Sequence, residues 1–142
     1  MARRFSTPSE NYFKKGLALF KRGKFKQAID EFVRAKTLSP DNELIHLYLG
    51  LSWEREGRGG EAEVNFKKAI NLDPNFAAPY LFLGLDLAER WVNSWKIKGH
   101  DHSLLKKSIY YYRKVIELEP ENQEARSFLK TLEEYENKKS KI

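Results

Sequence analysis

Residue types that commonly perform catalysis or bind metals are scarce in this chain. Its 142 residues include three histidines and no cysteine. His100 and His102 flank Asp101, but this triplet is far less specific than His-Glu-x-x-His, and no further metal ligand is positioned by the sequence. His46 has no neighbour that would orient a nucleophile. We therefore expect a solvated loop around residue 101 and a partly buried packing role for His46.

A glycine-rich segment is the other candidate for chemistry. Gly57-Arg58-Gly59-Gly60 could suggest a phosphate-binding loop, but no strand precedes it and no Gly-Lys-Ser/Thr follows. We interpret the segment as a turn between two helices. The sequence thus predicts no enzyme activity, no cofactor and no bound metal.

The composition is that of an ordinary helical protein. Hydrophobic residues make up 41% of the chain and charged residues 32%, which suits a domain with one core. The absence of cysteine excludes disulfides, thiolate catalysis and zinc ribbons. No stretch reaches the ~18 to 20 apolar residues of a membrane helix, and the N-terminus lacks the apolar core of a signal peptide. We expect a cytoplasmic protein.

An apolar pattern recurs after 34 residues. A third copy begins on schedule at Tyr80, but its second half, which ends at Pro120, arrives about a dozen residues late, so this copy carries an insertion. The pairs at the fixed offset are Gly16 and Gly50, Ala28 and Ala62, Phe32 and Phe66, Ala35 and Ala69, and Pro40 and Pro74.

Each copy carries the signals of two helices. Thr7-Pro8-Ser9-Glu10 is typical of a capping box, and Gly23 of a helix end. Pro40 ends the second helix, and Asp41 or Asn42 can cap the third. The small residues should let paired helices approach closely, and the aromatic residues should fill the space between pairs. The expected helices span residues 8–22, 25–38, 42–56, 60–71, 77–96, 103–118 and 121–138.

This repeat resembles the tetratricopeptide (TPR) family, whose units have about 34 residues, with Gly in one helix, Ala and an aromatic residue in the next, and a closing Pro. The match covers roughly residues 9–120, with departures such as Lys15 in place of a usual Leu. The resemblance implies an all-α, right-handed α-solenoid of three helix-turn-helix units. Residues 121–138 would then form a polar capping helix.

The expected domain organisation follows from these ranges. We expect a basic, disordered N-terminus at 1–7, a single TPR domain at 8–138 with an insertion at about 91–102, and a disordered tail at 139–142.

The resemblance also places a binding surface on the first helix of each unit, along the concave side. The best-known TPR site, a clamp of Lys, Asn and Arg side chains for chaperone C-termini, is not expected, because its positions hold Phe13, Leu17, Tyr48, Ala78 and Phe82. Apolar residues instead predict a groove for an apolar peptide or amphipathic helix, unless the solenoid or the last helix already covers them. The groove residues are Phe13, Leu17, Phe20, Leu47, Tyr48, Leu51, Leu81, Phe82 and Leu85.

Two tryptophans in the insertion form a possible second contact. Trp91 and Trp95 lie at i and i+4 on an extended helix, and hence on one side of it. Either this extension packs back on a neighbouring helix, or it presents both rings to a partner or to a second copy. Residues 96–102 should form a polar loop, with Asp101 or Ser103 capping the next helix.

Charge is concentrated at the N-terminal end. Residues 1–40 contain ten Lys and Arg but three Asp and Glu, so this repeat could attract an acidic partner, although charged runs mostly serve solubility. Nucleic acid is not an expected partner, since no recognition motif accompanies the charge. The sequence therefore favours a non-catalytic protein-interaction module, as an adaptor or chaperone-like protein. A self-assembling scaffold and a regulatory subunit that docks an acidic partner are the alternatives.

Overall fold

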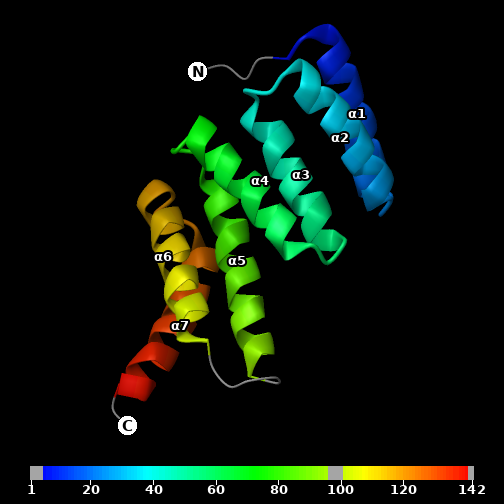
Figure 1. Cartoon of the computed structure of the whole chain (residues 1–142). Coiled ribbons are helices and arrows are strands. Elements are labelled where there is room, and N and C mark those ends of the chain that lie inside the picture. The colour runs from blue at the N-terminus through cyan, green and yellow to red at the C-terminus, as the bar shows by residue number, and fades with distance from the viewer. Residues whose placement is uncertain (1–4, 96–100, 141–142) are drawn as a thin grey trace. The chain divides into compact units, whose positions relative to one another are not determined.

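The structure, a computed structural model, describes residues 5–95 and 101–140. These residues form seven α-helices and no strand (Figure 1). All helix ends lie within two residues of the expected ones. The fold class predicted from the sequence is confirmed. The helices are α1 (Thr7–Lys21), α2 (Phe25–Leu38), α3 (Glu43–Arg55), α4 (Gly59–Leu72), α5 (Ala77–Ser94), α6 (His102–Leu118) and α7 (Gln123–Ser140).

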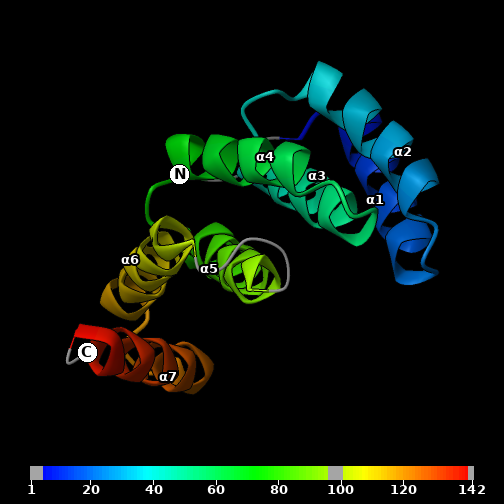
Figure 2. The ribbon, with the colours of Figure 1, turned by 60° about the horizontal axis from the view of Figure 1, so that its bottom comes forward.

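The helices group into two compact units, where the sequence suggests one domain. The first, Met1–Pro74, holds the hairpins α1/α2 and α3/α4, with α2 packed on α3. The second, Asn75–Ile142, holds the hairpin α5/α6, and α7 packs on α6 (Figure 2). Each unit has its own core and is described by itself.

Local signals set the helix ends. The N-cap of α1 is Ser6 rather than Thr7, because the Ser6 side chain accepts a hydrogen bond from the Ser9 amide at 3.2 Å. Gly23 ends the first hairpin turn with a φ of 76°, a left-handed conformation that favours glycine. Asn42 and Asp101 cap α3 and α6, as expected, by accepting hydrogen bonds from backbone amides two residues later.

The repeated aromatic residues pack within their hairpins. The Phe66 ring lies against Gly50 so closely that a Cβ on this glycine would meet Cε1 of the ring at 2.5 Å. Tyr112 lies against Gly84 in the same way, at 3.1 Å. The missing glycine side chain thus leaves room for these rings inside each pair. The rings also reach the next helix, as expected, since Phe32 lies 5.9 Å from Tyr48 of α3 and Tyr112 lies 5.7 Å from Phe128 of α7.

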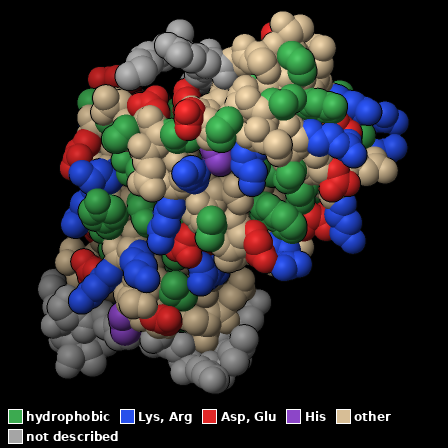
Figure 3. Space-filling model, turned by 45° about the horizontal axis from the view of Figure 1, so that its top comes forward, with side chains coloured by type: hydrophobic (Ala, Val, Ile, Leu, Met, Phe, Trp, Pro, Cys, Tyr) green, Lys and Arg blue, Asp and Glu red, His purple; other side chains and the backbone are tan. Residues whose placement is uncertain are grey.

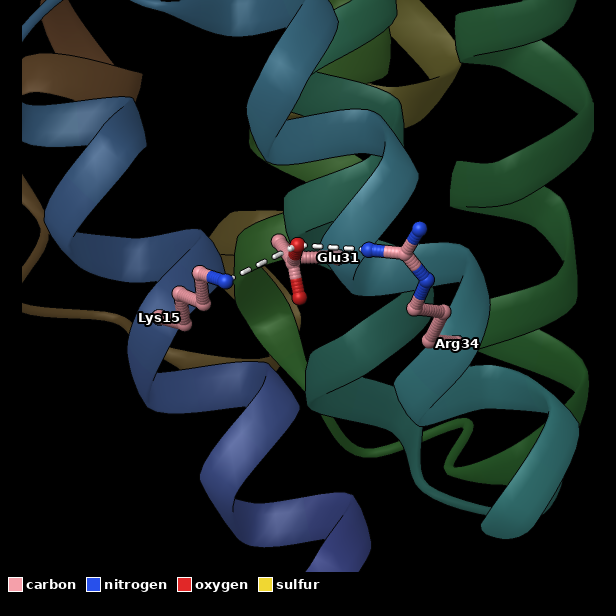
Figure 4. A network of polar contacts seen from close by, with 3 residues as sticks. All are labelled: Lys15, Glu31 and Arg34. Carbon is pink, nitrogen blue, oxygen red and sulfur yellow. Dashed lines mark hydrogen bonds and ion pairs between the residues drawn. The ribbon is translucent and has the colours of Figure 1, made fainter.

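A polar network joins α1 to α2 where the sequence departs from the TPR pattern (Figure 4). The buried Glu31 carboxylate uses Oε1 to contact Lys15 Nζ at 3.6 Å and to accept a hydrogen bond from Arg34 Nη1 at 2.6 Å. Lys15 stands where the family usually has Leu, so an ion pair replaces an apolar contact at this position.

Both ends of the described chain are more ordered than the sequence suggests. The Phe5 ring packs on Phe13 with centroids 5.0 Å apart, and Thr7 begins α1. At the other end, α7 continues to Ser140. The disorder expected at residues 1–4 and 141–142, and the polar loop expected at 96–100, lie outside the described residues. Within them, no helix combines the length and hydrophobicity needed to cross a bilayer.

Candidate functional site

The expected groove residues of the first unit divide into core and surface. Phe13 is wrongly placed in the groove, because it is only 6% exposed and its ring packs 5.6 Å from that of Phe32. Leu47 and Leu51 on α3 are also buried. Their burial agrees with the alternative in which the solenoid itself covers these positions. Successive residues of a helix are turned by about 100° around its axis. Residues next to the core face can therefore be buried together with it.

Three groove residues of the first unit remain half-buried: Leu17, Phe20 and Tyr48. The Tyr48 ring on α3 packs edge-on against Phe20 on α1, with centroids 5.7 Å apart. The Arg55 guanidinium lies 6.0 Å from the centroid of Phe20. These contacts make a partly open aromatic surface shared by α1 and α3, with a cation at its edge.

In the second unit, the expected groove residues all lie on α5. Leu81, Phe82 and Leu85 are half-buried. Leu85 lies four residues after Leu81 and three after Phe82, so the three side chains lie on adjacent parts of the helix surface. Partial exposure leaves them available to a partner, whereas the buried Leu83 and Leu87 of the same helix belong to the core.

The two tryptophans differ in burial. Trp91 is 4% exposed, and its ring packs edge-on against Tyr135 of α7, with centroids 5.4 Å apart. Trp95 is 43% exposed and packs on both Trp91, at 5.3 Å, and Tyr135, at 5.9 Å. Thus α5 packs back on a neighbouring helix through Trp91, and it still leaves one face of Trp95 open.

An apolar pocket of about 450 Å³ lies beside this aromatic cluster. Three of the residues that line it are large hydrophobic side chains that remain 42–47% exposed: Trp95, Phe128 and Tyr135. Glu89 contributes a carboxylate. The remaining lining residues are Leu85, Ala88, Trp91, Val92, Tyr112, Thr131 and Leu132.

The contribution of α7 was missed in the sequence, which suggests only a polar cap. Ala125 and Leu132 point inward and are buried. Phe128 and Tyr135, however, lie one turn before and after the inward position Leu132 and present large apolar surfaces. Their spacing of four and three residues around Leu132 is the signal that could have identified an apolar stripe on this helix.

Two buried polar atoms belong to residues that line the same pocket. Trp91 Nε1 and Tyr112 Oη have no hydrogen-bond partner within the described part of the chain. Burial raises the pKa of the Tyr112 phenol, and the carboxylate of Glu124 adds to this shift. The phenol therefore stays neutral, and Glu89 is the one carboxylate among the residues that line the pocket.

No metal or catalytic constellation emerges around the histidines. Within residues 5–95 and 101–140, no three His, Asp or Glu side chains could share a metal ion. His46 is 4% exposed, which confirms its packing role, and its Nε2 donates a hydrogen bond to the Pro40 carbonyl at 2.8 Å. His102 begins α6, and His100 lies outside the described residues. The glycine-rich segment lies at the turn between α3 and α4, as predicted, with Gly57 and Arg58 in the turn and Gly59 and Gly60 already at the start of α4.

Comparison with known proteins supports the repeat assignment. Residues 16–57 match a family model described as a TPR repeat. A comparison with curated proteins found no match.

Solved TPR domains have the same fold. The first TPR domain of Spaghetti (RPAP3), bound to the HSP90 peptide SRMEEVD, is 23% identical, with a TM-score of 0.78 over 93% of this chain and 98% of that one. The TPR domain of Aspergillus fumigatus Sgt2 is 19% identical, with a TM-score of 0.78 over 100% and 89% of the two chains. The second TPR domain of human RPAP3, in complex with the HSP70 peptide SGPTIEEVD, is 21% identical, with a TM-score of 0.74 over 89% and 95%.

At these identities the structural likeness establishes the fold alone. The sequence match runs from the middle of α1 to the end of α3, and the seven described helices fit three repeats followed by a last helix. Residues 16–57 therefore carry the sequence of a TPR repeat, and the chain has the fold of TPR domains.

Proposed function

We propose that this protein is a non-catalytic interaction module that binds an apolar or amphipathic peptide segment. The observation that carries this proposal is the pocket between α5 and α7, where Trp95, Phe128 and Tyr135 keep 42–47% of their surface exposed. Large aromatic side chains are costly to leave in water and are enriched at binding hot spots. Peptide binding by the TPR domains of Spaghetti and human RPAP3 adds support from the fold.

The groove expected from the sequence extends this proposal to smaller surfaces. In the first unit we assign it to the half-buried Leu17, Phe20 and Tyr48, and in the second to Leu81, Phe82 and Leu85. Leu85 also lines the aromatic pocket, so one segment of partner could cover both parts of α5. Phe13, Leu47 and Leu51 would support this surface from within the core.

Charge refines the choice of partner. Glu89 at the pocket wall forms no ion pair with any described residue. A bound segment with Lys or Arg next to its apolar side chains would give this carboxylate a partner. The acidic Glu-Glu-Val-Asp ends of the chaperone peptides seen with Spaghetti and RPAP3 would not, and the clamp positions Phe13, Leu17, Tyr48, Ala78 and Phe82 offer no cation or side-chain amide.

Peptide selection tests the proposal directly. Peptides enriched on the wild-type protein from a random displayed library should be rich in aromatic and aliphatic residues with adjacent Lys or Arg. In calorimetry, Trp95→Ala and Tyr135→Ala should each weaken their binding by about tenfold or more. Tyr110→Ala provides the matched control, because Tyr110 is an aromatic residue of the same unit that is 54% exposed outside the pocket.

The same variants separate the alternatives. Self-association of the wild type that Trp95→Ala abolishes would favour a self-assembling scaffold. Selected peptides that bind all variants equally would contradict the pocket, and tight binding of SRMEEVD would contradict the absence of a clamp.

A specific observation also favours the second candidate, an acidic partner docked on the basic first repeat. Lys21, Arg22, Lys24 and Lys26 surround the turn between α1 and α2, are exposed, and make no ion pair with any described residue. Binding through them would weaken steeply with salt, because exposed charges are screened. Arg3 and Arg4 belong to the same basic N-terminal stretch and lie outside the described residues.

A further inference from the structure

A second pocket lies in the first unit, on the side formed by α2, the start of α3 and α4. Its volume is about 700 Å³. Three lysines line it, Lys36 from α2 and Lys67 and Lys68 from α4, against a single carboxylate, that of Asp41 in the turn before α3. This pocket is separate from the apolar surfaces assigned to peptide binding, and its character is basic.

Two of the lysines are free to bind an anion. Lys67 lies 3.6 Å from Glu63 and is partly neutralised. Lys36 and Lys68 form no ion pair with any described residue, although they project from two different helices into one pocket. Two unpaired ammonium groups at one site repel each other, and a dianion between them would remove this repulsion.

A buried histidine completes the lining. His46 is 4% exposed, and its Nε2 donates to the Pro40 carbonyl at 2.8 Å. Because Nε2 donates this hydrogen bond, the single N–H proton of the neutral ring lies on Nε2. Nδ1 has no hydrogen-bond partner within the described residues. A second proton on the ring would therefore give Nδ1 an N–H group able to donate to an anion.

The charges around His46 agree with an anion site. Burial lowers the pKa of His46, and Lys36 from α2 and Lys68 from α4 lower it further, whereas the Pro40 carbonyl and Asp41 oppose this shift. The lysines of the pocket thus create a positive potential at the ring. On the face drawn in Figure 3, a histidine side chain lies recessed between Lys or Arg side chains.

We propose that this pocket binds a tetrahedral oxyanion, namely a phosphate group, through the ammonium groups of Lys36 and Lys68 and the protonated ring of His46. Asn71, which also lines the pocket, supplies a neutral amide donor. Thr37 and Asn65 contribute less, since they already donate to carbonyl groups of their own helices at 2.9 and 2.8 Å.

The test follows His46 by NMR during pH titrations of the whole chain. Sulfate is the first probe, because it stays a dianion throughout the range, and chloride at equal ionic strength is the control. Sulfate should raise the apparent pKa of His46, and inorganic phosphate should bind at the same site. The Lys36→Met/Lys68→Met double variant should weaken both anions about tenfold or more.

A matched variant removes the same charge elsewhere. Lys106→Met/Lys107→Met lies on α6 in the second unit, where both side chains are exposed and line no pocket assigned to binding, and it should keep wild-type anion binding. Circular dichroism verifies that both double variants are folded. The His46→Gln variant should bind the anion as the wild type does near pH 8. It should not show the tighter binding that protonation of His46 gives the wild type at lower pH. An equal response to sulfate and chloride, or equal anion binding by the two double variants, would overturn the proposal.

The source of the phosphate is decided by comparing free O-phosphoserine with a phosphoserine peptide and its unphosphorylated form. Equal affinity for the free amino acid and the phosphopeptide would identify the phosphate group alone as the ligand. Tighter binding of the phosphopeptide would show that the rest of the pocket contacts the residues that flank the phosphoserine. Binding of the unphosphorylated peptide with equal affinity would contradict a phosphate site.

Discussion

A methyl group at Gly16 would lie 2.6 Å from Cε1 of Phe32 and 2.7 Å from Cδ1 of the same ring. Because Phe32 is fully buried, its ring has little freedom to move aside. The glycine of the first helix and the aromatic residue of the second therefore act as one packing unit, and the same pairing recurs in the second and third repeats with different clearances.

These clearances predict an order of stability among Gly→Ala variants. Alanine favours a helix over glycine by about 1 kcal/mol, but overpacking a core costs about 1–3 kcal/mol. Gly16→Ala and Gly50→Ala, with clearances of 2.6 and 2.5 Å, should lower the melting temperature. Gly84→Ala, at 3.1 Å from Tyr112, should change it little. Thermal unfolding followed by circular dichroism measures all three, and a Gly84→Ala variant as unstable as Gly50→Ala would contradict this order.

The buried hydroxyl of Tyr112 predicts a neutral or stabilising substitution. Tyr112 is fully buried and Oη has no hydrogen-bond partner in the described chain. A buried polar group without a partner costs about 1–3 kcal/mol. Tyr112→Phe keeps the ring that stacks on Phe128 at 5.7 Å and should leave the free energy of unfolding unchanged or raise it by about 1 kcal/mol. A clear loss of stability in urea unfolding would show that the hydroxyl is bonded in solution.

The lowered pKa of His46 predicts a pH dependence of stability. Because the folded-state pKa lies below 6.5, the unfolded state binds more protons between these two values. The contribution of His46 to stability is therefore present above pH 6.5 and is lost as the pH falls through this window. Urea unfolding in a buffer without multivalent anions should show a smaller acid-induced loss for His46→Gln than for the wild type. Equal losses would mean that the ring is solvated in the folded state.

The groove pattern predicts the same effect for Leu51→Glu and Phe82→Glu, but the burial of the two residues predicts different effects on stability. Leu51 is 8% exposed, so Leu51→Glu would bury a charge without a partner and should cost about 3 kcal/mol or more. Phe82 is half-buried, and Phe82→Glu should keep most of the helical circular dichroism while it weakens binding of a selected peptide. Unfolding by Phe82→Glu as severe as that by Leu51→Glu would assign Phe82 to the core.

The sequence alone determined the repeats, the helices and most of their ends. Helix ends depend on residues within one turn of each other, so the sequence identified Gly23 as a helix end and narrowed the cap of α3 to Asp41 or Asn42 and the cap of α6 to Asp101 or Ser103. The 34-residue offset between Gly16 and Gly50 likewise appears in the chain itself.

Only the tertiary structure decided which apolar residues are core and which side chains meet at a pocket. Phe13 and Leu17 both belong to the apolar part of α1, yet the rings of α2 and α3 bury the first and leave the second half-open. Tyr135 reaches Trp91 from a helix more than forty residues away, and Lys36, His46 and Lys68 line one pocket from three helices. Periodicity gives the side of a helix on which a residue lies, but burial and charge at a site depend on side chains that folding brings together from distant parts of the chain.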